Sequence, residues 1–180
     1  MKDITLGLDL ASTSSGAVIL DGAQLIHFEL IQPVDEMKNP LERLAFIFRR
    51  VSELFDEYDI LNVAIEDIGL NAGMRNFSVA QTNLLLIGGC LALANLHGCI
   101  VLLMKPSEWR KVVGVYRDQV TREEMHREFQ KQKGIELANE YFGFGFKWVS
   151  EYQDKKDHHS DIAEASLIAL ASYKIFKKGG

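Results

Sequence analysis

Cysteine is scarce in this sequence, with only Cys90 and Cys99 among 180 residues. Both lie in apolar surroundings, which favours buried free thiols over a disulfide, and free thiols fit a reducing cytoplasm. No second pair of Cys or His residues has the spacing of zinc ligands. The sequence therefore argues against a disulfide-stabilised scaffold and against a zinc site, and it predicts a cytoplasmic protein.

Long hydrophobic runs are also missing. The longest apolar stretch, 84–96, is shorter than the roughly 20 residues that cross a bilayer, and the N-terminus enters a strand-like run without a signal peptide. The sequence contains no internal repeat, low-complexity stretch or interdomain linker, and its length suits one sizeable core. We expect a single domain over residues 1–180 that does not associate with a membrane.

Positive charge is in short supply, but it is unevenly distributed. The net charge is −5 at pH 7, which by itself argues against a nucleic-acid partner. Residues 1–104 carry 6 Lys and Arg against 13 Asp and Glu, whereas residues 105–133 carry 8 against 5. The basic segment is either a solvated helix face or a phosphate-binding surface, and part of the acidic excess fits a cation site.

The sequence does contain a regular series of strand and helix patterns. Apolar runs bounded by turn signals predict strands at 4–10, 16–21, 24–31, 61–68 and 99–104. Helical spacing predicts a short helix after Pro106 and longer helices at 40–58, 79–96, 122–142 and 161–176. Three consecutive strands followed by helix-connected strands indicate an α/β fold with a mixed five-stranded sheet, three antiparallel then parallel strands, and helices on both faces.

Four acidic residues are notable because each belongs to an apolar segment. Asp9 and Glu66 lie in strand-like runs, and Asp161 and Glu164 open the last helix, three residues apart and therefore on one face. Asp161 alone would suggest an N-cap, but carboxylates are seldom buried unless they are paired or bound to metal. Together the four predict a site for hard cations such as Mg²⁺ or Mn²⁺, and two such ions can drive phosphodiester hydrolysis.

Several motifs carry a resemblance to a known superfamily. The segment 7–16 (GLDLASTSSG) resembles the first strand and turn of the RNase H-like superfamily. The segment 64–67 (AIED) resembles the glutamate-bearing fourth strand of RuvC-like Holliday-junction resolvases, and 161–165 (DIAEA) is similar to the opening of their last helix. Residues 105–114 (KPSEWRKVVG) match the segment after their fifth strand, and the order of the motifs agrees over about residues 3–172.

The resemblance implies a metal-dependent endonuclease that resolves four-way or other branched DNA in a bacterial cell or a phage-infected host. It implies metal ligation by Asp9, Glu66, Asp161 and Glu164, two Mg²⁺ ions with Mn²⁺ as a substitute, and products with a 5′-phosphate and a 3′-hydroxyl. Because two strands must be cut, it also implies a twofold homodimer. The nearly all-apolar helix at 79–96 is either the dimer interface or a core helix, and the sequence identifies no motor-protein partner.

The sequence leaves two alternatives for the fourth metal ligand, each based on a different alignment of the motif around Asp161. In the Asp-x-Ala-Asp-Ala register of the family, Glu164 stands where the family usually has Asp, and its extra methylene shifts the carboxylate outward. In a His-x-x-Asp register, His158 and Asp161 are the ligands, and Glu164 is a neighbour on the next turn. His158 is therefore a candidate catalytic residue, either as a ligand or in proton transfer.

DNA contacts are expected from side chains that bind phosphates. The candidates are Arg75, Lys105, Arg110, Lys111, Arg117 and Arg122. The sequence departs from the bacterial resolvases after Glu66, where the segment 67–69 lacks the aromatic residue that many relatives wedge into the junction. Phe77 is the candidate wedge in its place.

Other functions compete with junction resolution. A related RNase H-like nuclease acting on flaps, forks or RNA would use the same carboxylates. The segment 9–14 also resembles the phosphate loop of actin-like ATPases and sugar kinases, but those proteins need two such domains around the nucleotide. A catalytically inactive DNA-binding module is disfavoured because all four acidic positions are filled.

Overall fold

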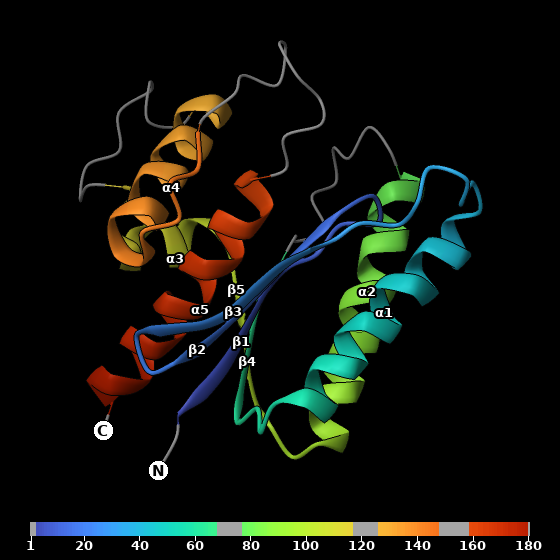
Figure 1. Cartoon of the computed structure of the whole chain (residues 1–180), viewed down its shortest axis with the longest axis horizontal. Coiled ribbons are helices and arrows are strands. Elements are labelled where there is room, and N and C mark those ends of the chain that lie inside the picture. The colour runs from blue at the N-terminus through green and yellow to red at the C-terminus, as the bar shows by residue number, and fades with distance from the viewer. Residues whose placement is uncertain (1–2, 68–76, 117–125, 148–158, 180) are drawn as a thin grey trace.

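The computed structural model describes residues 3–67, 77–116, 126–147 and 159–179, with side chains except those of residues 77, 78 and 179. Its elements follow in the order β1 (Ile4–Asp9), β2 (Ser15–Asp21), β3 (Gln24–Ile31), α1 (Pro40–Glu57), β4 (Asn62–Glu66), α2 (Phe77–Leu96), β5 (Ile100–Met104), α3 (Pro106–Val113), α4 (Arg127–Phe142) and α5 (His159–Gly179) (Figure 1). Each predicted strand and helix is confirmed. Helix α4 is seen from Arg127 onward, because residues 117–125 lie outside the described part of the chain.

The five strands form one mixed sheet in the order β3-β2-β1-β4-β5. Strands β1, β2 and β3 pair antiparallel, whereas β4 pairs parallel with β1 and β5 parallel with β4. This arrangement confirms the predicted fold class. It also places the carboxyl ends of β1, β4 and β5 at the same edge of the sheet, which is where ligand sites form in sheets of this kind.

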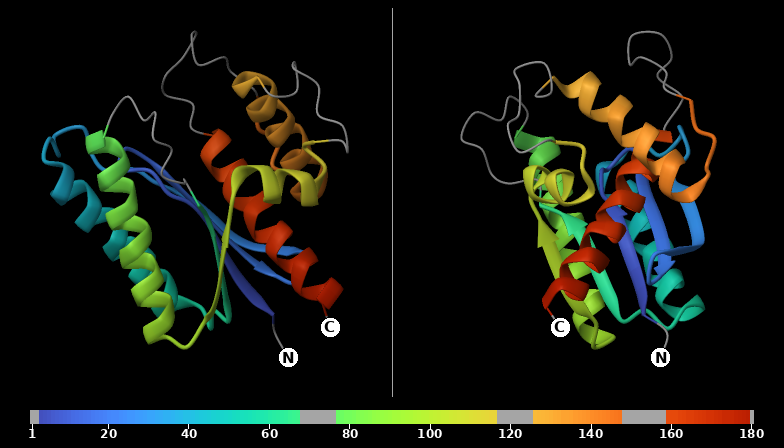
Figure 2. Two further views of the ribbon diagram at one scale, coloured as in Figure 1. Left: turned by 180° about the vertical axis from the view of Figure 1, so that it is seen from behind. Right: turned by 90° about the vertical axis from the view of Figure 1, so that its left-hand side faces the viewer.

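Helices cover both faces of the sheet. Figures 1 and 2 show α1 and α2 on one side and α3, α4 and α5 on the other. Successive side chains of a strand point to opposite faces, so β2 sends Ala17 and Ile19 into the core under α1 and α2, and Val18 and Leu20 into the core under α5. The middle strands β1, β2 and β4 are therefore buried on both sides, whereas the edge strands β3 and β5 keep exposed side chains.

Helix α5 lies very close to strands β1 and β2. A β-carbon on Gly7 would lie 2.6 Å from the β-carbon of Ala169, and one on Gly16 would overlap the backbone of Asp161. Glycine at these two strand positions allows the helix to approach the sheet backbone directly. The first turn of α5 is thereby held over the carboxyl end of β1.

Helix α2 carries no Asp, Glu, Lys or Arg. Over Val79–Leu96 it has the length and composition of a membrane span, although only one third of that span is buried within the protein. This corrects the prediction that no apolar stretch reaches that length. Leu86, Ile87 and Cys90 belong to the core that α2 shares with α1 and the sheet. Other leucines of α2 remain on the surface.

The two cysteines are free thiols, as predicted. Burial raises the pKa of the Cys90 thiol to about 12. The Cys99 thiol donates a hydrogen bond to the carbonyl oxygen of Ile60 at 3.1 Å, and burial raises its pKa as well. Because the thiolate is the reactive form of cysteine, neither residue is suited to nucleophilic chemistry at neutral pH.

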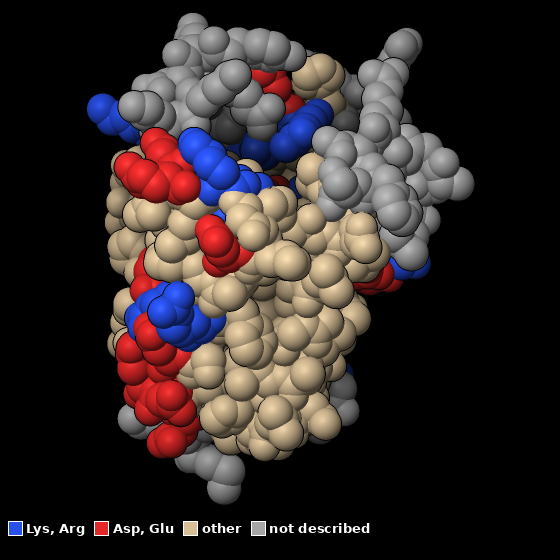
Figure 3. All heavy atoms as spheres, turned by 90° about the vertical axis from the view of Figure 1, so that its right-hand side faces the viewer, with Lys and Arg blue, Asp and Glu red and all other residues tan. Residues whose placement is uncertain are grey.

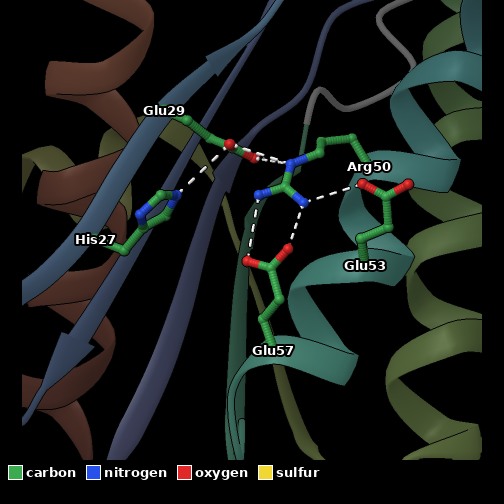
Figure 4. Close-up of polar contacts among 5 residues, drawn as sticks. All are labelled: His27, Glu29, Arg50, Glu53 and Glu57. Carbon is green, nitrogen blue, oxygen red and sulfur yellow. Dashed lines mark hydrogen bonds and ion pairs between the residues drawn. The ribbon is translucent and has the colours of Figure 1, made fainter.

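A charged cluster joins helix α1 to the edge strand β3 (Figure 4). Arg50 donates hydrogen bonds to Glu29 at 2.9 Å, to Glu57 at 2.7 Å and to Glu53 at 3.0 Å, and His27 lies 3.5 Å from Glu29. The bond from Arg50 lowers the pKa of the Glu57 carboxyl below its usual value. Arg50 therefore fixes the β3 edge of the sheet to the helix that crosses it.

Candidate metal centre

Asp9 and Glu66 lie at the carboxyl ends of the neighbouring parallel strands β1 and β4. Leu8 pairs with Ile65 in the register of these strands, and both side chains enter the core under α1 and α2. Because side chains alternate between faces, the next residues, Asp9 and Glu66, both point to the face covered by α5. Two carboxylates 57 residues apart in the sequence are thus placed side by side, as the sequence predicted.

Helix α5 brings Asp161 and Glu164 to the same place from the opposite direction. Both residues lie in the first two turns of the helix, three residues apart and on one face. The protein around Asp9 removes most of its water, and this burial raises the pKa of the Asp9 carboxyl well above its usual value. Glu164, Asp161 and Glu66 raise it further, so the other three carboxylates lie close enough to act on Asp9.

Glu66 experiences the same crowding. Burial raises the pKa of its carboxyl to about 7, and Glu164 contributes to the rise. Arg110 and a hydrogen bond from Trp109 act in the opposite direction. The indole Nε1–H of Trp109 donates to Glu66 Oε2 at 2.6 Å, and the Trp109 ring is fully buried. Trp109 therefore fixes the orientation of the Glu66 carboxylate.

The other two carboxylates also have donors from the protein. The hydroxyl of Ser14, in the turn between β1 and β2, donates to Asp161 Oδ2, and the hydroxyl of Ser160 lies 3.3 Å from Asp161 Oδ1. Arg110 Nη2 donates to Glu164 Oε1 at 2.8 Å. Ser14 and Trp109 were not identified from the sequence, because only the folded sheet brings them to the carboxylates.

The donor set fits a hard divalent cation. All four carboxylates supply oxygen ligands, and the mutual repulsion that raises the pKa of Asp9 is relieved when a cation binds. Among the residues that the structure describes, no three His, Cys, Asp or Glu side chains are grouped as ligands of a single ion.

The predicted phosphate-binding residues fall into different groups. Lys105, the residue that caps α3, and Lys111, in its second turn, are exposed, whereas Arg110 is turned inward toward Glu164. Lys131 of α4, which was not among the candidates, lowers the pKa of Asp9 and so lies near the carboxylates. The remaining predicted positions, Arg75, Arg117, Arg122 and His158, lie outside the described residues. Phe77 begins α2, but its side chain is not described.

A stack of aromatic rings leads from the surface to the start of α5. The ring centroids of Phe144 and Phe146 are 4.5 Å apart, and those of Phe146 and His159 are 4.6 Å apart, with 9° between the planes of each pair. The side chain of Asn139 bonds both the N–H and the carbonyl of Phe146, at 2.9 and 2.7 Å. The stack therefore supports the first turn of α5, two residues before Asp161. Nothing in the spacing of these aromatics indicated this role.

Comparison with known proteins gives matches by structure alone. No protein-family model and no curated protein matches the chain. The structure of RuvC from Thermus thermophilus in complex with a Holliday junction substrate matches with a TM-score of 0.72 and 18% identity, covering 98% of this chain and 96% of that one. A second Thermus thermophilus RuvC structure matches with a TM-score of 0.69 and 20% identity, over the same shares of the two chains. The yeast mitochondrial Holliday junction resolvase Ydc2 matches with a TM-score of 0.57 and 13% identity, over 99% of this chain and 81% of that one. The chain therefore has the RNase H-like fold that is found in RuvC.

Proposed function

We propose that this protein is a metal-dependent, structure-selective DNA endonuclease that resolves four-way junctions by hydrolysing phosphodiester bonds. The observation that carries the proposal is the meeting of Asp9, Glu66, Asp161 and Glu164 at the carboxyl ends of β1 and β4. The likeness to resolvases of the same fold supports the choice of substrate. An actin-like ATPase is disfavoured because the chain matches these nucleases over nearly its whole length.

The carboxylates Asp9, Glu66, Asp161 and Glu164 would hold Mg²⁺, or Mn²⁺ as a substitute. Divalent ions bound there would lower the pKa of an attacking water and stabilise the leaving 3′ oxygen, giving a 5′-phosphate and a 3′-hydroxyl. The chain orients these ligands through fixed donors, the Trp109 indole at Glu66 and the Ser14 hydroxyl at Asp161. Such fixed partners normally tune both metal affinity and activity.

Cations around the centre would bind the DNA backbone. Lys105, just before α3, and Lys111, within it, are exposed, and Lys131 lies near Asp9. Phosphate contacts of this kind position a nucleic acid without reading its sequence. Arg75, Arg117 and Arg122 stay as further phosphate-binding candidates, and Phe77 stays as the candidate wedge.

A homodimer through α2 completes the proposal, because junction resolution needs two cuts. Figure 3 shows a broad face without charged side chains beside the charged residues of α1. On this side Leu84 and Leu85 of α2 are exposed, Leu85 to 56%. A shallow apolar groove of about 250 Å³ runs between α1 and α2, lined by Leu44, Ala45, Phe48, Leu85, Leu86 and Gly89. An uncharged helix with exposed leucines suits a second copy of the same helix across a twofold axis.

The substrate class is tested by comparing a synthetic four-way junction with a fork, a flap and an RNA–DNA hybrid. We expect Mg²⁺ or Mn²⁺ to be required, EDTA to stop the reaction, and the junction to be cut at least about tenfold faster than the other substrates. Gel analysis of end-labelled strands gives the rates and shows whether the ends carry a 5′-phosphate. If the hybrid, the flap or the fork is cut faster than the four-way junction, the protein is a nuclease for that substrate and not a junction resolvase.

The dimer is tested by sedimentation of the wild type and of Leu85→Glu. A charge buried without a partner costs several kcal/mol, so the dimer dissociation constant should rise at least about 100-fold. The variant should nick a plasmid with an extruded cruciform, whereas the wild type should linearise it by paired cuts. Ile26→Glu is the matched control, since Ile26 is an exposed apolar residue of β3. If the wild-type protein is monomeric and only nicks the plasmid, both the α2 interface and the resolution of junctions are contradicted.

A further inference from the structure

Arg110 is a cation built into the carboxylate centre. Its Nη2 lies 2.8 Å from Glu164 Oε1 and its Nη1 lies 3.0 Å from Gln130 Oε1, while its guanidinium also interacts electrostatically with Glu66. Only 14% of the Arg110 side chain is exposed, and 11% of the Glu164 side chain. An arginine buried this far contributes charge to the centre rather than a contact at the protein surface.

Helix α3 holds the guanidinium rigidly. The helix begins at Pro106 and ends at Val113, and the N–H of the following Gly114 donates to the carbonyl oxygen of Arg110 at 3.1 Å. The guanidinium lies 4.8 Å from the centroid of the Trp109 ring, and the Trp109 indole itself donates to Glu66. Two neighbouring residues of one short helix are therefore fixed onto two different carboxylates, Glu66 and Glu164.

Arg110 acts on two of the four carboxylates. Glu66 and Glu164 share the positive charge of Arg110. For Asp9, the cation that acts on its carboxyl is Lys131, whereas Glu164, Asp161 and Glu66 all act against its ionisation. A second divalent cation is therefore needed least where the guanidinium already lies, beside Glu164.

We propose that Arg110, which contacts Glu164, takes the place of the second of two metal ions, so that each chain binds one divalent ion. This inference rests on the proposed metal-dependent function. One ion and the guanidinium together balance most of the charge of the four carboxylates. A second ion at Glu164 would be repelled by the guanidinium, because arginine does not lose its proton in proteins.

The number of divalent ions bound per chain tests this inference, and the measurement needs no DNA. Mn²⁺ is titrated into the full chain, and the free ion is counted from its electron paramagnetic resonance signal. We expect the wild type to bind one Mn²⁺ per chain. Arg110→Gln should bind two, with the dissociation constant of the second ion lowered at least tenfold. Arg110→Lys keeps the positive charge and should bind one, as should Arg49→Gln, which removes an exposed arginine of α1.

Two results would overturn the inference. One is a wild-type count of zero or two ions, and the other is a folded Arg110→Gln protein with the same count as the wild type. Near-ultraviolet circular dichroism checks the fold, and if Arg110→Gln does not fold, the wild-type count decides alone. Two ions in a protein that resolves junctions would reject this inference and leave the proposed function intact. One bound ion per chain in a protein that cuts no DNA would support this inference and reject the proposed function.

Discussion

Replacing Asp9 by Asn should reduce cleavage of a four-way junction at least about a thousandfold while leaving junction binding intact. A metal ion contributes several kcal/mol to the transition state of phosphodiester hydrolysis, and each 1.4 kcal/mol is a factor of ten in rate. Asp9 lies at the centre of the carboxylate group, where the other three carboxylates act on it. Single-turnover cleavage and a gel shift in EDTA measure the two effects. Any change in junction binding should be a tightening, since a negative charge facing the phosphates is removed.

The same substitution should raise the melting temperature of the metal-free protein. Burial and three neighbouring carboxylates raise the pKa of Asp9 in the folded state above its unfolded value. For a carboxyl shifted in this direction, the contribution to stability is fully present below the unfolded pKa and is lost as the pH rises through the folded pKa. Asparagine removes that loss, so the gain in melting temperature should be largest at neutral and alkaline pH and vanish near pH 3.

Asp56→Asn is the matched control, because it removes an exposed carboxylate of α1 and changes the net charge equally. It should cleave at the wild-type rate, and its melting temperature should stay unchanged in EDTA. An Asp9→Asn protein that cuts at the wild-type rate would remove Asp9 from the centre, and with it the observation on which the nuclease proposal depends.

Gly7→Ala should destabilise the protein by about 3 kcal/mol, which lowers the melting temperature of a domain of this size by roughly 10 °C. The added β-carbon would lie 2.6 Å from the β-carbon of Ala169 and 2.9 Å from its backbone nitrogen, so helix α5 must move away from the sheet. Urea denaturation measures the loss. Because α5 also carries Asp161 and Glu164, cleavage should fall even at temperatures where the variant is fully folded.

Gly134→Ala provides the comparison for this helix contact. Gly134 lies inside helix α4, and its added β-carbon would meet only the Cδ1 atom of Leu167, at an ordinary 3.8 Å. Alanine is preferred to glycine within a helix by up to about 1 kcal/mol, so this variant should be as stable as the wild type or more so. Equal stability of Gly7→Ala and Gly134→Ala would contradict the close approach of α5 to β1.

The sequence by itself determined the order of the elements and the identity of the four acids. The apolar runs of β1 and β2, the turn signals that bound them and the helical spacing of α1 are local patterns, and the structure confirms each of these elements. Asp9 and Glu66 could be assigned to one site because residues that end neighbouring parallel strands on the same face must lie together. These inferences need only the geometry of single elements and their pairing.

The tertiary structure alone decided what surrounds each carboxylate. Trp109 and Glu66 are 43 residues apart, Arg110 and Glu164 are 54 apart, and Ser14 and Asp161 are 147 apart. The sequence placed Arg110 among surface cations, whereas the packing of α3 against α5 turns it toward Glu164. Such contacts depend on the angle and depth at which helices pack on the sheet. The glycines of β1 and β2 allow α5 to pack close to the sheet. The distance between α5 and these strands cannot be read from any pattern along the sequence.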